Sequence, residues 1–196
     1  MSVFARHQPL RGQSLVEFAL VLPMLLVLLL GIADFGRVFS AGITAEAMAR
    51  DAAEAAAQEY LQLRRAADPA QPSTADYQAA RDRAEEVVCE EAETLPNHAS
   101  SGGSCVMPVV ATCIHDEWGD HCGAPSTAPP ADCTLMGSWP PVLADQPGGL
   151  PYVRVTACYQ FTTLFNISDL HLPLGWSITL GEVWLQRDRI FTVADY

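Results

Sequence analysis

The chain has 196 residues, of which 49% are hydrophobic and 17% are charged, and its formal net charge is −12. Beyond Arg37 it carries 21 acidic residues against 8 arginines and no lysine, a net charge of −13. An acidic surface of this kind repels phosphate groups, so we do not expect the distal part of the chain to bind nucleic acid.

The first element is an apolar stretch from Leu15 to Ala33. All 19 of its residues except Glu17 are apolar, glycine or proline. At a rise of about 1.5 Å per residue, a helix over this stretch is about 28 Å long, which matches the hydrocarbon thickness of a bilayer. The stretch therefore predicts a single membrane-spanning helix, in which Pro23 can cause a kink or a local loss of helix.

Glu17 is the exception within this helix. A carboxylate in the membrane costs about 2.5–3.5 kcal/mol at the helix centre and less near an end. Glu17 lies near the start and has no basic residue beside it. Either it has a partner or a function, or its side chain reaches back to the lipid headgroups.

The charges beside the helix predict its orientation. Residues 1–12 hold Arg6 and Arg11 and no acidic residue, so by the positive-inside tendency they stay in the cytoplasm. Residues 38–196 are then extracytoplasmic. All the cysteines lie on this side, and an even number in an exported domain favours disulfide bonds, although spacing does not give their pairing. The cysteines are Cys89, Cys105, Cys113, Cys122, Cys133 and Cys158.

Two ordinary interpretations of the N-terminus stay open. It could be a cleaved secretory signal, with weak cleavage sites before Ala41 or Met48. The length of the apolar run, and the charges of Asp34 and Arg37 just before those sites, argue against this. It could also be a membrane anchor that is never cut.

Two helices are predicted after the apolar stretch. Residues 38–67 are rich in alanine, glutamate, glutamine and arginine, so the membrane helix should continue outward as one long helix. A buried stripe is expected at Met48, Ala52, Ala55, Ala56 and Tyr60. A second, amphipathic helix is expected from Asp76 to about Glu93. Its apolar face comprises Tyr77, Ala80, Ala84, Val87, Val88 and Ala92.

The rest of the chain predicts a cross-linked loop followed by β-structure. Residues 96–151 are rich in proline, glycine, serine and cysteine, and only Val106–Cys113 resembles a strand, which Pro108 should confine to a sheet edge or a bulge. Apolar and polar residues alternate over Tyr152–Phe161, so a half-buried strand is expected there, with a loop partner for Cys158. Residues 177–193 should add one or two strands with a bulge near Gly181. The predicted class is α+β, with a long helix against a small antiparallel sheet and a disulfide-rich loop.

Motifs of catalysis are missing from the sequence. It contains no Gly-x-Ser-x-Gly, no phosphate-binding loop and no His-Glu-x-x-His. The histidines His115 and His121, with the nearby cysteines, could in principle bind zinc, but the short Cys-x-x-Cys pairing that would favour zinc is not there. We therefore expect no catalytic residue, no metal and no cofactor. An exported enzyme or metalloprotein that uses this loop remains the alternative.

Residues 12–37, GQSLVEFALVLPMLLVLLLGIADFGR, resemble a known family. Gly12, followed five residues later by Glu17 and then by an apolar run, resembles a type IV prepilin. Within that group the segment resembles the TadE-like pseudopilins of tight-adherence (Flp-type) pilus systems. The motifs that carry the resemblance are Gly12, Glu17-Phe18-Ala19-Leu20, Pro23, Gly31-Ile32 and Asp34-Phe35-Gly36-Arg37.

The resemblance implies a processing and assembly pathway. A prepilin peptidase would cut between Gly12 and Gln13 on the cytoplasmic side, since glycine has no side chain to obstruct the enzyme. Glu17 would become the fifth residue of the mature chain and could neutralise the new amine of its own or a neighbouring subunit. Asp34 and Arg37 would pair at the outer membrane boundary, where docking to neighbouring pilins is a further possible role.

The resemblance also implies partners and a layout. The partners are other pilin or pseudopilin subunits, the prepilin peptidase, an inner-membrane assembly platform and the lipid bilayer. The layout is a leader at 1–12, an assembly helix at 13–37 and an extracytoplasmic domain at 38–196. The cysteine-rich loop departs from the plain family pattern and leaves room for a further role such as adhesion. The alternative is an uncleaved single-pass membrane protein with a disulfide-stapled, ligand-binding ectodomain.

Overall fold

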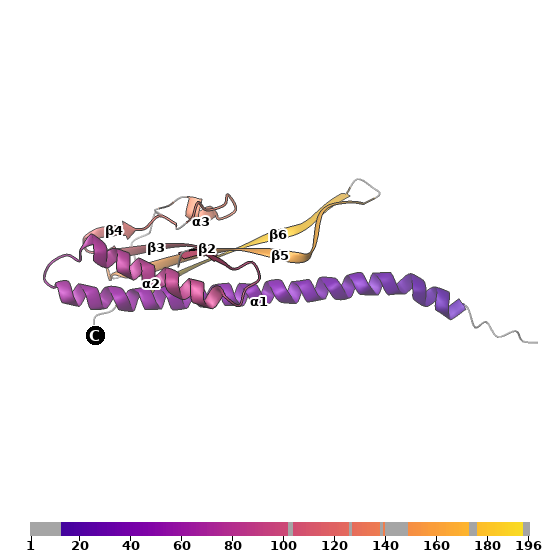
Figure 1. Cartoon of the computed structure of the whole chain (residues 1–196), viewed down its shortest axis with the longest axis horizontal. Helices are drawn as coiled ribbons and strands as arrows, with labels where there is room; N and C mark the ends of the chain where they lie inside the picture. Colours follow the sequence, from indigo (N-terminus) through magenta and orange to yellow (C-terminus); the bar gives the residue numbers. More distant parts are fainter. Residues whose placement is uncertain are drawn as a thin grey trace, which may run out of the picture. The chain divides into compact units, whose positions relative to one another are not determined.

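The computed structural model describes residues 13–101, 104–125, 127–137, 139, 149–172 and 176–193 (Figure 1). The chain divides between Arg37 and Val38 into two compact units, and helix α1, Gln13–Ala67, contributes to both. The predicted α+β class is confirmed, because a long apolar N-terminal helix is combined with antiparallel sheets and three disulfide bonds.

In the first unit, the described residues are the part of α1 that ends at Arg37. The helix is continuous through Pro23, so no local loss of helix occurs there. Among the described residues, α1 is the one helix that is long and apolar enough to cross a membrane. This agrees with the single span predicted from the sequence.

In the second unit, α1 turns a stripe of small side chains toward the core. The predicted positions Met48, Ala52, Ala56 and Tyr60 are completely buried, whereas Ala55 is only half-buried. Alanine is the best helix former and leaves room for neighbouring elements to approach closely. The buried positions of α1 are Ala41, Ala45, Met48, Ala49, Ala52, Ala53, Ala56, Ala57 and Tyr60.

Helix α2, Thr74–Ala92, is the predicted second helix. Ser73 caps its N-terminus: the serine side chain accepts a hydrogen bond from the backbone N–H of Asp76, and the Asp76 carboxylate accepts one from the backbone N–H of Ser73. This capping box satisfies backbone donors that would otherwise lack partners. The buried face contains Tyr77, Ala80, Ala84, Val88 and Ala92, as expected.

The strands form two antiparallel sheets. One has two short strands, and the other has four strands in the order β4-β3-β5-β6. The strands are β1 (Ala99–Ser101), β2 (Ser104–Met107), β3 (Val109–Asp116), β4 (Gly119–Cys122), β5 (Tyr152–Leu172) and β6 (Trp176–Thr192).

The strand predicted over Val106–Cys113 is wrong in its extent and position. Pro108 separates β2 from β3, since proline cannot donate a ladder hydrogen bond. Strand β3 is not at an edge, because it lies between β4 and β5. The segment 96–151 also contains more regular structure than expected, namely β1, β2, β3, β4 and helix α3 (Thr134–Gly137).

Strands β5 and β6 form a long hairpin. The 177–193 region forms one strand rather than two, and its pairing is irregular at the predicted place. Thr162 pairs with Glu182, and the next pair is Ile167 with Leu180, so the ladder is interrupted opposite Gly181. The extra residues lie in β5 and not in the strand that carries Gly181.

The four-stranded sheet is covered on both faces. Helices α1 and α2 pack on the face that presents Val153, Val155 and Ala157, and this is the main core. On the other face, Met136 of α3 packs against Val109 and Cys158, with Ala111 and Cys133. Figure 1 shows the helices on one side of the sheet and α3 on the other.

All six cysteines are paired. The bonds join Cys89 to Cys105, Cys113 to Cys122 and Cys133 to Cys158. The prediction of disulfide bonds is confirmed, and so is the expectation that Cys158 bonds to a loop lying over its face of the sheet. Two of the bonds tie the irregular region to α2 and β5, and the third joins β3 directly to β4.

Candidate functional site: the N-terminal helix

The first part of α1 presents apolar side chains around its whole circumference. Residues 14–33 are all exposed, with fractions up to 75% for Leu20 and Met24. Burying one large apolar side chain gains about 1.5–3 kcal/mol, so a helix of this kind in water would be very unfavourable. This surface is consistent with a helix that crosses a membrane once.

Glu17 is exposed within this apolar surface, next to Phe18, whose side chain is 59% exposed. It lies about one helical turn after Gln13, the first residue of α1. Gly12 is outside the described residues. Cleavage after Gly12, and pairing of Glu17 with an amine at Gln13, stay predictions.

Gly31 needs no close contact within its own chain. A Cβ atom added at Gly31 would meet nothing within 4 Å, and the same holds for Gly36. Glycine in a helix interior is destabilising by about 0.5–1 kcal/mol relative to alanine. Small residues on an exposed helix leave room for a neighbouring helix to approach closely.

The apolar part of the first unit ends at an ion pair. Arg37 Nη1 lies 3.1 Å from Asp34 Oδ1, and the two residues are three positions apart on the helix. The contact expected from their spacing is therefore present. Surface pairs at this spacing contribute only about 0.2–0.5 kcal/mol, so this pair marks the polar boundary of the helix more than it stabilises it.

A comparison of the sequence with known protein families finds a match in the region of this helix. Residues 12–54 match the TadE-like protein family. The resemblance seen over residues 12–37 is confirmed and extends to residue 54, into the second unit. No curated protein and no solved structure matches the chain. The match covers less than half of the chain.

The TadE-like segment, residues 12–54, contains two surfaces of different character. Up to residue 33 its described side chains are exposed and, apart from Ser14 and Glu17, apolar, whereas from Ala41 to Ala53 it contributes the first half of the buried alanine stripe. The match thus ends within α1, before Tyr60. The disulfides, the sheet and α2 lie beyond it.

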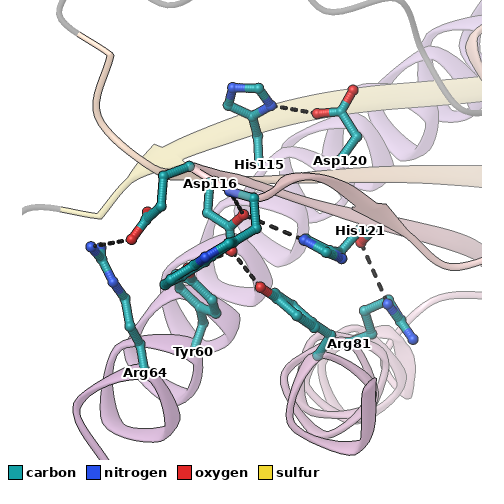
Figure 2. A network of polar contacts seen from close by, with 10 residues as sticks. Tyr60, Arg64, Arg81, His115, Asp116, Asp120 and His121 are labelled. Carbon is teal, nitrogen blue, oxygen red and sulfur yellow. Dashed lines mark hydrogen bonds and ion pairs between the residues drawn. The ribbon is translucent and has the colours of Figure 1, made fainter. Parts of the chain in front are cut away.

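Outside the TadE-like segment, the most elaborate polar site surrounds Asp116 at the end of β3 (Figure 2). The hydroxyl groups of Tyr60 and Tyr77 donate to Asp116 Oδ2 over 2.8 and 2.6 Å. The backbone N–H of Trp118 donates to Asp116 Oδ1 over 2.9 Å. His121 Nε2 lies 3.4 Å from the same oxygen, and its ring stacks on Tyr77 with the centroids 3.7 Å apart. We call these five residues the Asp116 cluster.

The Asp116 cluster anchors β3 to helices α1 and α2. The Asp116 side chain is completely buried, and a buried carboxylate is costly unless hydrogen bonds satisfy it. The pKa values of Tyr60 and Tyr77 are raised, first by burial and then by their hydrogen bonds to Asp116. Both tyrosines therefore stay protonated and remain donors at neutral pH. The cluster fixes the β3–β4 hairpin to helices α1 and α2.

Two further ionic contacts hold the hairpin. His115 Nδ1 contacts Asp120 across the hairpin, and Arg64 Nη2 of α1 lies 2.9 Å from Glu117 Oε1. Figure 2 shows both contacts beside Asp116. These histidines and carboxylates, which suggested possible catalytic or zinc-binding groups, thus have structural partners.

Zinc binding by the cysteine-rich loop would need cysteine thiolates as ligands. Every cysteine is instead bonded to another cysteine. Within the described parts of the chain, no group of three or more histidine, cysteine, aspartate or glutamate side chains could hold a metal ion. The sequence did not predict the Asp116 cluster. The available signal was a tyrosine on the buried face of each predicted helix, Tyr60 and Tyr77, whereas the predicted strand ended at Cys113, before Asp116.

Proposed function

We propose that the protein is a minor pilin or pseudopilin of a tight-adherence (Flp-type) pilus system, and that it assembles through its N-terminal helix. The observation that carries this proposal is the TadE-like match over residues 12–54, which includes Gly12, Glu17 and the whole exposed apolar surface. The protein would be a protease substrate and a structural subunit, and not an enzyme.

The proposed pathway begins in the bacterial inner membrane. Residues 1–12, which carry Arg6 and Arg11, stay in the cytoplasm, and residues 38–196 lie outside. A prepilin peptidase cuts between Gly12 and Gln13. Disulfide bonds in the second unit are in keeping with an oxidising compartment outside the cytoplasm.

Assembly transfers the helix from lipid to contacts with other pilin subunits and with the inner-membrane platform. The exposed apolar side chains can pack against lipid before assembly and against neighbouring helices afterwards, so little hydrophobic free energy is lost on transfer. The open surfaces at Gly31 and Gly36 would admit those neighbours. Glu17 would pair with the amine at Gln13, because an ion pair in an apolar assembly costs less than a lone charge.

The Glu17→Gln substitution tests the assembly step. The variant keeps the shape and hydrogen-bonding capacity of the side chain but removes its charge. We expect normal cleavage by a coexpressed peptidase and at least a tenfold loss of the protein from the sheared pilus fraction, about 1.4 kcal/mol or more. Glu86→Gln, which also removes one carboxylate but lies on the exposed face of α2 in the second unit, is the matched control and should assemble normally. Equal incorporation of Glu17→Gln and wild type would contradict the role of Glu17.

The second candidate is a single-pass membrane protein that keeps its N-terminus and displays a ligand-binding ectodomain. The three disulfides and the anchored β3–β4 hairpin favour a durable binding domain. The two candidates differ at the N-terminus, since only the pilin is cut after Gly12.

A further inference from the structure

An open pocket of about 420 Å³ lies where the C-terminal end of α1 meets the turn between β3 and β4. Its charged and aromatic lining consists of Arg64, Arg65, Asp68, Glu117 and Trp118. The volume falls within the range of about 300–1,000 Å³ that is usual for small-molecule sites. All the lining residues lie beyond residue 54, where the TadE-like segment ends, so the proposed assembly function does not use the pocket.

Trp118 is held at this pocket by a buried anchor. Its side chain is in the β3–β4 turn, and the residue is 38% exposed. Its backbone N–H donates to Asp116, which also accepts hydrogen bonds from Tyr60 and Tyr77. The disulfide between Cys113 and Cys122 closes the same hairpin. These contacts hold the backbone of Trp118, and its partly exposed indole ring can receive an apolar surface.

The charged side chains of the pocket divide into a paired and an unpaired set. Arg64 lies 2.9 Å from Glu117, and its guanidinium carbon is 6.0 Å from the centroid of the Trp118 ring. Arg65 and Asp68 are exposed and have no side-chain hydrogen bond or ion pair among the described residues. Among the described residues, the pocket thus offers one donor group and one acceptor group without side-chain partners beside a partly exposed aromatic ring.

These properties select one class of ligand. Two arginines balance two carboxylates, so the pocket gives no net attraction to an anion such as an acidic peptide. Quaternary ammonium groups are typically recognised by a cage of several aromatic rings, and Trp118 is the one aromatic side chain in this lining. A sugar ring has C–H groups on one face, which pack on an aromatic ring, and hydroxyl groups at its edge, which both donate and accept hydrogen bonds.

We propose that this pocket binds a neutral saccharide, with the ring of Trp118 as the stacking surface and with Arg65 and Asp68 as hydrogen-bonding groups for the hydroxyls. A lining of this size holds one or two sugar residues. The inference stands apart from pilus assembly, since it requires neither cleavage after Gly12 nor the charge of Glu17.

Saturation-transfer NMR on the full-length protein tests this site. The protein should be held in lipid nanodiscs, because maltoside and glucoside detergents would themselves present sugars. The probes are the methyl glycosides of glucose, mannose, galactose and N-acetylglucosamine. We expect magnetisation transfer to at least one of them, with the C–H protons of one ring face receiving most of the transfer.

Substitutions then locate the binding. Trp118→Ala should reduce the transfer about tenfold or more, and Trp118→Phe should keep part of it, because a smaller aromatic ring still stacks. Val183→Ala is the matched control. Val183 is also apolar and 38% exposed. It pairs with Phe161, which lies nine residues along β5 from Tyr152. Val183 is therefore roughly 30 Å along the strand from Tyr152.

The exposed polar groups give a second test that does not depend on the hairpin. Arg65→Ala and Asp68→Ala remove exposed side chains and should leave the fold intact while weakening transfer several-fold. No transfer from wild type to any of the four probes would overturn the proposal. Transfer that persists in Trp118→Ala, or in the Arg65→Ala and Asp68→Ala variants together, would also overturn it.

Discussion

The hydroxyl group of Tyr60 in helix α1 lies 2.8 Å from Asp116 Oδ2 in strand β3, although the two residues are 56 positions apart in the chain. The same oxygen accepts a hydrogen bond from Tyr77 in α2. One buried carboxylate therefore ties two helices to the sheet.

Removing the Tyr60 hydroxyl should destabilise the second unit. In Tyr60→Phe the buried carboxylate loses one of its donors, and hydrogen bonds to charged groups contribute about 1.5–3 kcal/mol. We expect a loss of that size in the free energy of unfolding. Guanidinium unfolding followed by tryptophan fluorescence is suitable, because all four tryptophans lie beyond residue 37. Glu117→Gln, which removes a more exposed ion pair, should cost less than about 1 kcal/mol. Equal effects of the two substitutions would contradict the anchoring role.

Alkaline pH should destabilise the same unit. The pKa values of Tyr60 and Tyr77 are raised in the folded state by burial and by Asp116, whereas unfolded tyrosine ionises near pH 10. Above about pH 10 the unfolded chain releases protons that the folded chain keeps, so the stability present at lower pH is progressively lost.

Phenolate absorbance measures this directly. Two tyrosines should titrate only at a pH well above that of a free tyrosine, or only on unfolding. The Tyr60→Phe, Tyr77→Phe double variant should lose this late phase and show a flatter decline in stability above about pH 10. A late phase that is unchanged in the double variant would assign it to other tyrosines.

The buried alanine stripe should not tolerate large residues. Ala56 is completely buried in the core, and Ala66, on the same helix, is exposed. Ala56→Leu inserts three carbon atoms into a packed interior, which costs about 1–3 kcal/mol. Ala66→Leu should change the unfolding free energy by less than about 0.5 kcal/mol. The same denaturation measurement compares them, and equal effects would show that α1 does not pack as described.

The disulfides should differ in their contributions. Cys133 and Cys158 are separated by 25 positions, whereas Cys113 and Cys122 are separated by 9. A longer closed loop restricts the unfolded chain more, so replacing the first pair by alanine should cost about 1 kcal/mol more than replacing the second. Denaturation of the two double variants tests this ranking, and the opposite order would show that native-state contacts outweigh loop entropy here.

Much of the fold could be predicted from the sequence. The helices follow from composition and spacing, because the apolar stretch and the stripe through Met48 and Tyr60 are long and periodic. Strand β6 and the part of β5 from Tyr152 to Phe161 follow from alternation and β-branched residues, whereas the continuation of β5 to Leu172 was not predicted. The cysteines could be assigned to disulfides from their number and location.

Other features could not be predicted because they depend on contacts distant in sequence. Strands β1, β2 and β4 have three or four residues each and contain serine, cysteine, glycine, aspartate and histidine, so their pairing depends on context. The disulfide pairing depends on which loops meet in space. The Asp116 cluster joins Tyr60, Tyr77 and His121 from three separate elements, and no local pattern indicates that.

The mass of the N-terminus tests the central claim most directly. The full-length protein should be coexpressed with a cognate prepilin peptidase as wild type, as Gly12→Val and as a Gly36→Ala control, whose added methyl group has open space. The pilin assignment predicts a mature chain that begins at Gln13 in wild type and in the control, and an uncut chain in Gly12→Val. A wild-type chain that still begins at Met1 or Ser2, or that begins near Ala41 or Met48, would contradict it.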